Sequence, residues 1–304
     1  MSRSRTLALF AVVTVVYGTA FPAVKTGLDF LPPLLFVAAR NYLAAVLLLG
    51  YVGLTAEYRT PRTRGDWAAV LTGGAFLMGG VGFGFVGQQF ITSGVAAIIF
   101  SLSPIVTGLL AWPLLPDERL AGRDYLGVLL GFLGVAIIVR PDPSALVDPA
   151  VVGKLLVFVG VSVVALGTVL VRRSRPEMPI PALTGWAMVI GATIQVGFAV
   201  AIGESLAAVR VTPLAIGMVG YLGVFPGAIG FVLYLTLMAE VGALKANLVT
   251  YLTPVVALVV GWLFLAERVQ PVTLLGFGVI VAGFALLESR ELAGELAKYR
   301  GLVR

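Results

Sequence analysis

The sequence contains no cysteine and no histidine, and charged residues make up only 12% of it. Without cysteine, the chain cannot form a disulfide framework, a zinc ribbon or a reactive thiol. Without histidine, it lacks the usual proton shuttle near neutral pH and the commonest metal ligand. We therefore expect no metal and no other cofactor.

Hydrophobic residues make up 59% of the chain. A soluble domain carries about 25% charged residues, so the few charges here cannot cover a water-exposed surface, and we expect membrane lipid as the surrounding solvent. The net charge of +6 raises the alternative of nucleic-acid binding. However, the basic residues lie in short loops between apolar runs, the pattern by which a membrane protein is oriented. We therefore expect no nucleic-acid partner.

Ten segments are apolar and about long enough to span a bilayer, which takes roughly 20 residues. They cover residues 6–27, 34–54, 67–88, 94–115, 121–140, 150–171, 182–203, 213–237, 242–265 and 271–287. The first follows a basic N-terminus but shows no small-residue cleavage site, so we interpret it as a span and not as a signal peptide. The sequence predicts an all-α integral membrane protein with ten transmembrane helices.

The basic residues predict the orientation of these helices. With both termini in the cytoplasm, fourteen of the 21 Lys and Arg residues fall on the cytoplasmic side and four on the opposite side. Lys25, Arg40 and Lys245 fall within or at the edge of spans. Such a bias is typical of a multi-pass protein of the cell membrane with both ends inside.

The chain also repeats itself with an offset of 149 or 150 residues. The landmarks Gly18, Thr19, Leu102, Pro104, Trp112 and Glu118 are matched by Gly167, Thr168, Leu252, Pro254, Trp262 and Glu267. The predicted units are residues 6–140 and 150–288, joined by a linker at residues 142–149 and followed by a cytoplasmic tail, residues 289–304. Because five spans per unit is an odd number, the second unit must enter from the opposite side. Inverted repeats of this kind recur in transporters.

The paired stretches "SLSPIVTGLLAWPLLPDERL" and "YLTPVVALVVGWLFLAERV", each followed by a glycine-spaced helix, resemble the drug/metabolite transporter superfamily, EamA type. "YGTAFPAVKTGL" and "ALGTVLVRR" resemble the openings of the two repeats. The first copy departs from the pattern at "WPLLPDER", where Pro113 and Pro116 indicate a broken helix end. The resemblance implies a ten-helix transporter with a central cavity and, in many members, export of amino acids, amines or other metabolites. It leaves the substrate open.

Arg40 is the clearest candidate for substrate binding, because a charge inside a membrane is expensive and usually functional. Its planar fork could bind a substrate carboxylate or phosphate, or it could be a structural arginine that satisfies carbonyl groups. No acidic residue lies deep in a span, although Glu240 could face the cavity if the neighbouring helices are broken. A proton pump usually keeps such a carboxylate, so we expect facilitated diffusion or exchange.

Other polar and aromatic residues inside the spans are further candidates for substrate contact: Tyr17, Gln88, Trp186, Tyr221, Asn247 and Tyr251. Asn247 and Tyr251 are spaced i, i+4 and share a helix face. Proline removes a backbone donor and can kink a helix. We expect kinks that serve gating at Pro22, Pro104, Pro226 and Pro254, of which Pro104 and Pro254 are repeat-related.

Other classes of protein fit the sequence less well. The acidic clusters of prenyltransferases, the paired aspartates of intramembrane proteases and a phosphate-binding Gly-rich loop are all missing. A passive membrane scaffold would explain the spans but not the repeat. We therefore predict a secondary transporter of a small organic metabolite, working by alternating access and in the direction of efflux, as a monomer or homodimer. The alternative is an exchanger or importer of anionic metabolites such as phosphorylated sugars, which would need Arg40 and Lys245 in the cavity.

Overall fold

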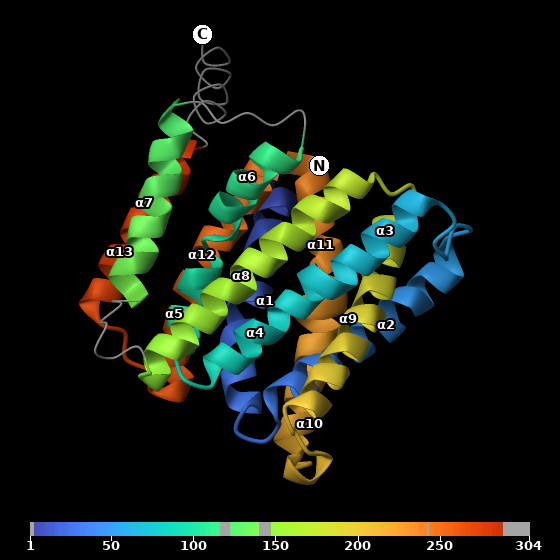
Figure 1. Ribbon diagram of the computed structural model, residues 1–304, viewed down its shortest axis with the longest axis horizontal. Coiled ribbons are helices and arrows are strands. Elements are labelled where there is room, and N and C mark those ends of the chain that lie inside the picture. Colours follow the sequence, from blue (N-terminus) through green and yellow to red (C-terminus); the bar gives the residue numbers. More distant parts are fainter. Residues whose placement is uncertain (1–2, 116–121, 140–146, 242, 288–304) are drawn as a thin grey trace.

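The computed structural model describes residues 3–115, 122–139, 147–241 and 243–287 of the chain (Figure 1). Helices make up most of these four ranges, and no strand occurs in them. The prediction of an all-α protein is therefore confirmed. The predicted C-terminal tail, residues 289–304, most of the linker and Glu118 lie outside the described residues.

The first half of the chain contains the helices up to α7. Their bounds are α1 (Arg3–Gly27), α2 (Pro33–Thr55), α3 (Arg64–Thr72), α4 (Gly79–Gln88), α5 (Ser93–Phe100), α6 (Ser103–Leu114) and α7 (Gly122–Val139). A π-helical segment, η1 (Gly73–Met78), joins α3 to α4 without interruption. The glycines of this stretch favour such irregular winding, because they add no side chain that resists it.

The second half follows a similar but not identical order. Its elements are α8 (Pro149–Ser174), α9 (Ile180–Ala201), the short 3₁₀ helix η3 (Leu206–Ala208), α10 (Pro213–Leu222), the π-helical segment η4 (Gly223–Ile229), α11 (Gly230–Val241), α12 (Ala243–Leu265) and α13 (Pro271–Leu287). The two π-helical segments begin 150 residues apart, at Gly73 and Gly223.

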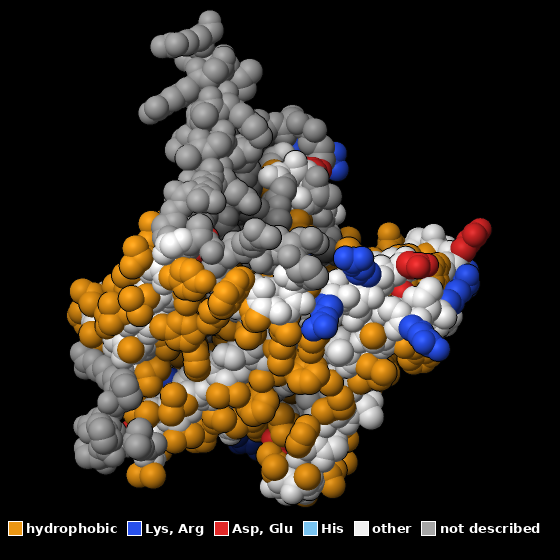
Figure 2. All heavy atoms as spheres, turned by 45° about the horizontal axis from the view of Figure 1, so that its top comes forward, with side chains coloured by type: hydrophobic (Ala, Val, Ile, Leu, Met, Phe, Trp, Pro, Cys, Tyr) orange, Lys and Arg blue, Asp and Glu red, His pale blue; other side chains and the backbone are white. Residues whose placement is uncertain are grey.

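Eight helical stretches of the described residues are long and apolar enough to cross a membrane. Two shorter apolar helices, Asp124–Val139 and Pro271–Leu286, fall in the remaining two predicted segments. Figure 2 shows hydrophobic side chains over much of the surface, with charged side chains gathered mainly toward one side. The chain is therefore a multi-pass membrane protein. The predicted segments also agree closely with the helices, as for residues 34–54 and α2 (Pro33–Thr55).

Glycines bring several helix pairs into close contact. A Cβ atom on Gly134 of α7 would lie 2.6 Å from the carbonyl oxygen of Gly276 on α13. A Cβ atom on Gly80 of α4 would lie 3.0 Å from the carbonyl oxygen of Gly160 on α8. Small residues at helix interfaces let backbones approach in this way, which favours packing in a membrane.

Helices α2 and α9 pack against each other, and two carboxylates bind backbone amides across the two halves of the chain. The carboxylate of Glu204, which follows α9, accepts hydrogen bonds from the amides of Leu34 and Leu35, both at 3.0 Å, at the start of α2. The carboxylate of Asp66, in the first turn of α3, accepts the amides of residues 177–178, in the loop before α9, at 2.9 and 3.0 Å. The first amides of a helix lack intrahelical partners, so Glu204 caps α2, whereas Asp66 fixes the loop that leads into α9.

The four predicted kink prolines lie in different surroundings. Pro22 and Pro254 lie inside the continuous helices α1 and α12, and Pro226 lies inside η4. Pro104 instead lies at the start of α6, directly after the break that separates α5 from α6. A proline fits the first turn of a helix, where its missing amide hydrogen is not needed. The repeat-related prolines Pro104 and Pro254 therefore lie in different helical contexts in the two halves, and a role of the four prolines in gating stays a prediction.

Candidate functional site

Arg40 lies on the buried face of α2. Phe36 and Ala44 precede and follow it by one helical turn, and they are 0% and 1% exposed. Residues spaced by four share a face of a helix, so the sequence directs the arginine into the protein. It is the eighth residue of α2, which places it about 10 Å along the helix from its start. The structure thus keeps the cation inside the membrane-crossing part of the helix.

The guanidinium group of Arg40 rests on an aromatic ring. Its Cζ lies 5.3 Å from the ring centroid of Phe85 on α4, a distance at which a cation and a π-system attract each other. The Nε atom is buried and has no hydrogen-bond partner. Within the described part of the chain, Arg40 also forms no ion pair. A donor in this position is available to a ligand.

A tyrosine of α1 lies near this arginine, and a tyrosine of α10 packs against the apolar cluster beside it. Tyr17 of α1 is close enough to Arg40 to interact with it electrostatically. The ring of Tyr17 meets that of Tyr234 edge-on, with centroids 6.2 Å apart. Tyr221 of α10 packs against the apolar cluster that contains Phe85. The structure therefore brings together Arg40 and Tyr17, two of the residues that the sequence predicts to contact substrate, and places Tyr221 against the same apolar cluster as Phe85.

Tyr221 is itself held in place from two sides. Its hydroxyl lies 2.5 Å from the Thr19 hydroxyl on α1. Its ring stacks on Phe225 of η4, with centroids 5.4 Å apart and an angle of 28° between the planes. Because Phe225 belongs to a π-helical segment, a change in winding there would move the stacked tyrosine. Such segments are frequent at functional sites.

A buried chain of amides lies beside Arg40. Asn41 Nδ2 donates to Gln195 Oε1 at 3.0 Å, and Gln195 Nε2 donates to the carbonyl oxygen of Met78 at 2.8 Å. Asn41 and Gln195 are 0% and 2% exposed. Met78 ends η1, so this chain joins α2 and α9 to the π-helical segment of the first half. In the sequence, Asn41 stands out as an amide directly after Arg40, and Gln195 as an isolated glutamine in an apolar span. Neither position indicates which residue the side chain binds.

Gln88 and Lys25 form a separate group near the ends of α4 and α1. Gln88 Nε2 donates to the carbonyl oxygen of Phe21 at 2.5 Å, next to Pro22. Lys25 Nζ donates to the carbonyl oxygens of Gln88 and Gln89 at 2.9 and 3.0 Å. A cation at the C-terminal end of a helix compensates its unpaired carbonyl groups and dipole. Lys25 therefore has a structural partner here.

Two of the remaining candidates, Trp186 and Tyr251, make contacts elsewhere in the structure. Trp186 Nε1 donates to the carbonyl oxygen of Arg59, in the loop between α2 and α3, at 2.9 Å. Tyr251 is buried against Phe284 of α13, with ring centroids 4.1 Å apart. The side chains of Asn247 and Lys245 lie outside the described residues. Of the two residues predicted to share a helix face, Asn247 and Tyr251, the structure describes only the side chain of Tyr251, and this side chain packs against α13.

Chemically, the arrangement suits an anion. It offers one cation without a described counter-charge, hydroxyl groups on Tyr17 and Tyr221, and aromatic surface on Phe85. In the described part of the chain, no three His, Cys, Asp or Glu side chains cluster in a way that could hold a metal ion. Groups of these kinds can bind the acidic group and the apolar or planar body of a small organic solute.

Comparisons with known proteins agree with this architecture. The model of the EamA-like transporter family matches residues 4–140 and 151–289. The uncharacterized transporter YvbV of Bacillus subtilis is 27% identical over 98% of this chain and 96% of its own length. The uncharacterized inner membrane transporter YedA of Escherichia coli is 28% identical over 92% of this chain and 89% of its own.

Two further matches concern function and fold. A probable terminal-alkyne amino-acid exporter of Streptantibioticus cattleyicolor is 28% identical over 96% of both chains. One protein crystal structure, 20% identical in sequence, superposes on 96% of this chain and 99% of its own with a TM-score of 0.66. That structure shares the fold with this chain.

Proposed function

Because this chain belongs to the EamA-like transporter family, we propose that it is a secondary transporter that moves a small organic metabolite out of the cell by alternating access. The similar protein from Streptantibioticus cattleyicolor is named a probable amino-acid exporter, which supports both the direction and a substrate with a carboxylate. Family members named as transporters also support a role other than catalysis.

The proposed architecture is ten spans in two inverted five-helix repeats. It is supported by the π-helical segments η1 and η4, whose starts are separated by the same offset as the sequence repeat. Equivalent helices of the two halves also pack against each other, α2 with α9 and α7 with α13. Glu204 and Asp66 each bind backbone amides of the other half of the chain. In such proteins, one repeat rocks against the other around a central site.

The observation that carries the proposed site is the uncompensated cation of Arg40. A buried guanidinium without a carboxylate partner is unfavourable in a membrane. A substrate carboxylate would supply the missing charge and accept two parallel hydrogen bonds from the fork. Tyr17, Phe85 and Tyr221 would then contact the rest of the solute. A sugar phosphate would satisfy the same arginine, so the anionic-metabolite alternative shares this site.

The test is transport by purified protein in vesicles, with a panel of amino acids, amines and sugar phosphates. For the anionic solute that is transported, Arg40→Gln should lower transport per folded molecule on the order of 10- to 100-fold, because a charge-assisted hydrogen bond is lost. Arg40→Lys should lower it less, since the charge remains but the fork is lost.

Arg268→Gln is the matched control, because Arg268 is exposed and follows α12. Transport that is unchanged in both Arg40 variants would remove Arg40 from the site. A loss of folded protein that accounts for all of the lost transport would make Arg40 structural. A cationic substrate, with Arg40→Gln as active as the wild type, would contradict the proposed substrate chemistry.

A further inference from the structure

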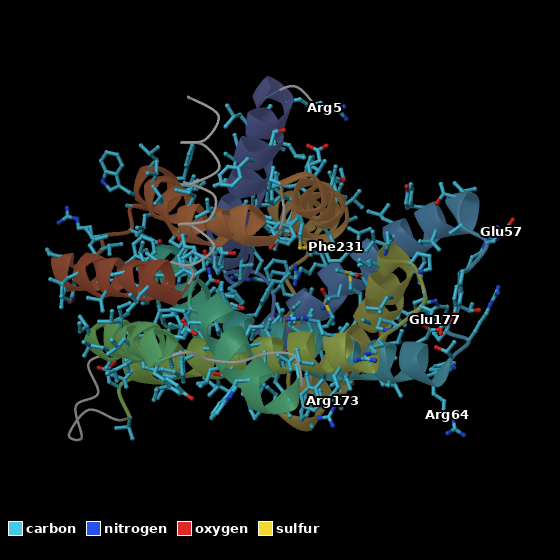
Figure 3. All side chains as sticks on the ribbon, turned by 90° about the horizontal axis from the view of Figure 1, so that it is seen from above. Arg5, Glu57, Arg64, Arg173, Glu177 and Phe231 are labelled. Atoms are coloured by element: carbon cyan, nitrogen blue, oxygen red, sulfur yellow. The ribbon has the colours of Figure 1, made fainter. Side chains whose placement is uncertain are left out.

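Arginines from two separate loops gather at one end of the molecule. The six residues are Arg59, Arg62, Arg64, Arg172, Arg173 and Arg175, and all of them are exposed. The first three belong to the loop between α2 and α3 and to the start of α3, and the other three to the end of α8 and the loop before α9. Figure 3 labels Arg64, Glu57 and Glu177 toward this end, with Arg173 nearer the middle of the view.

Backbone contacts make one surface of the two loops. A Cβ atom on Gly65 would lie 2.6 Å from the carbonyl oxygen of Ser174, so only a glycine allows this approach. Asp66 Oδ1 accepts the amides of residues 177–178, and Asp66 Oδ2 accepts the Thr63 amide at 3.0 Å. One buried carboxylate thus fixes the first-half loop and the second-half loop in the same place.

Few acidic groups compensate the six arginines. Asp66 is fully buried, and its two oxygens are occupied by backbone amides and by the Tyr58 hydroxyl. The hydrogen bond to Asp66 also raises the pKa of Tyr58, which keeps that hydroxyl protonated. Glu57 and Glu177 are the other two acidic residues of this surface, and both are exposed. The surface therefore carries a net positive charge.

Apart from Arg172, which has an interaction partner, the arginine side chains keep most of their donors. Arg59 and Arg62 donate only to backbone carbonyl oxygens, those of Ala56 and Glu57. Within the described residues, the side chains of Arg64, Arg173 and Arg175 form no hydrogen bond or ion pair. Arginine binds phosphate through two parallel hydrogen bonds, so the surface is suited to a phosphate group.

Apolar side chains lie directly next to this basic surface. Leu54 at the end of α2 is 89% exposed, Trp67 and Leu71 of α3 are both 51% exposed, and Ile180 of α9 is 50% exposed. All four belong to helices that are able to cross a membrane. Tryptophan is enriched at the level of the lipid headgroups. A ligand here meets arginine at one end and an apolar surface at the other.

We propose that this surface is a binding site for an anionic phospholipid. The phosphate lies between the α2–α3 loop and the α8–α9 loop, and the acyl chains lie along the exposed apolar side chains of α2, α3 and α9. Polybasic segments at the ends of membrane helices attract anionic lipids. Because the two loops belong to different halves of the chain, the bound lipid bridges the halves.

The experiment uses the full-length protein in a neutral detergent and measures bound lipid by native mass spectrometry and thermal shift. We expect phosphatidylglycerol to bind and raise the melting temperature, whereas phosphatidylcholine does neither. The double variant Arg64→Gln/Arg173→Gln should bind phosphatidylglycerol about 25-fold more weakly, at roughly fivefold for each arginine removed. Arg268→Gln, the exposed control outside the cluster, should bind as the wild type does.

Inorganic phosphate is the second probe, because it shares the phosphate group of the lipid but has no acyl chains. If inorganic phosphate alone raises the melting temperature as much as the lipid does, the site is a free-phosphate site and the lipid proposal is wrong. Equal binding of the two lipids, or unchanged binding in the double variant, would also overturn it. Should that variant not fold, Arg64→Lys/Arg173→Lys keeps the charge and loses the fork, and it should bind more weakly than the wild type.

Discussion

Asn41 on α2 donates a hydrogen bond to Gln195 on α9 over 3.0 Å, and neither side chain is open to solvent. This bond joins the two halves of the chain next to Arg40. Replacing Asn41 by Ala leaves the Oε1 atom of Gln195 buried without a donor. We expect Asn41→Ala to lower the free energy of unfolding by about 1–3 kcal/mol, the usual penalty of an unpaired buried group, as measured by unfolding of the purified protein.

A double-mutant cycle with Gln195→Ala isolates this bond. The coupling energy should fall in the range of about 0.6–1.7 kcal/mol that side-chain hydrogen bonds show between membrane helices. Tyr42→Phe is the matched control, because it removes a hydrogen bond between the same helices, to Thr193, that is exposed. Strictly additive effects of the two alanines would show that the bond does not couple the helices.

Gly276 and Gly278 of α13 allow a second comparison within one helix. A Cβ atom on Gly276 would lie 2.6 Å from Ile138 and 2.7 Å from the carbonyl oxygen of Gly134, whereas a Cβ atom on Gly278 would meet no atom within 4 Å. Gly276→Ala should therefore force α7 and α13 apart and destabilise the protein by about 1–3 kcal/mol, as overpacking does.

Gly278→Ala should leave the melting temperature unchanged or raise it slightly, since alanine is the better helix former. Thermal unfolding of the two variants in the same detergent gives the comparison. Equal melting temperatures for both variants would contradict the close packing of α7 and α13.

The helices could be predicted from the sequence because apolar runs in a membrane protein have few alternatives to a helix. The same patterns do not predict irregular winding inside a run. The glycine-rich stretch Gly73–Met78 and the stretch around Pro226 both become π-helical. Pro104 starts a new helix, whereas Pro254 remains within one. In the first of these stretches, the side chain of Gln195 on α9 donates a hydrogen bond to the Met78 carbonyl group. A contact of this kind comes from another helix and cannot be predicted from one apolar run.

The site could be predicted only in part, because its residues come from helices that are far apart in sequence. Arg40 stands out as a charge in an apolar run, and Tyr17 and Tyr221 as polar aromatics. Nothing in the sequence distinguishes Phe85, whose ring contacts Arg40, from the other phenylalanines. Trp186 resembles a site residue in the sequence, yet its indole bonds to a loop carbonyl. Which face of a helix points to the centre depends on packing that periodicity alone does not describe.

The orientation of the chain is the next testable property. The bias of fourteen basic residues to four predicts that reporter fusions after Arg64, Arg123 and Arg175 lie in the cytoplasm, and that fusions within residues 142–149 lie outside. Reporter enzymes that are active on only one side of the membrane give the measurement. A cytoplasmic signal from the 142–149 fusions would contradict an odd number of spans per half and therefore the inverted repeat.

Energy coupling follows from where the carboxylates lie. Asp66 is buried, but backbone amides and Tyr58 occupy both of its oxygens, and Glu204 and Glu267 likewise accept backbone amides of Leu34 and Ser93. Carboxylates bound in this way act as helix caps and are poorly suited to taking up and releasing protons during a transport cycle. We therefore expect transport down a substrate gradient to continue when the proton gradient is collapsed.

The measurement is solute flux in vesicles with an imposed substrate gradient, with and without a protonophore, at equal external and internal pH. Fluxes that agree within about twofold would fit facilitated diffusion or exchange, because no proton has to move with the solute. Glu240, which is exposed on α11, provides the decisive variant. If accumulation instead requires a pH gradient and Glu240→Gln abolishes that requirement, the carboxylate carries the proton and the uncoupled mechanism is wrong. If Glu240→Gln leaves flux unchanged in both conditions, proton movement through this side chain is excluded.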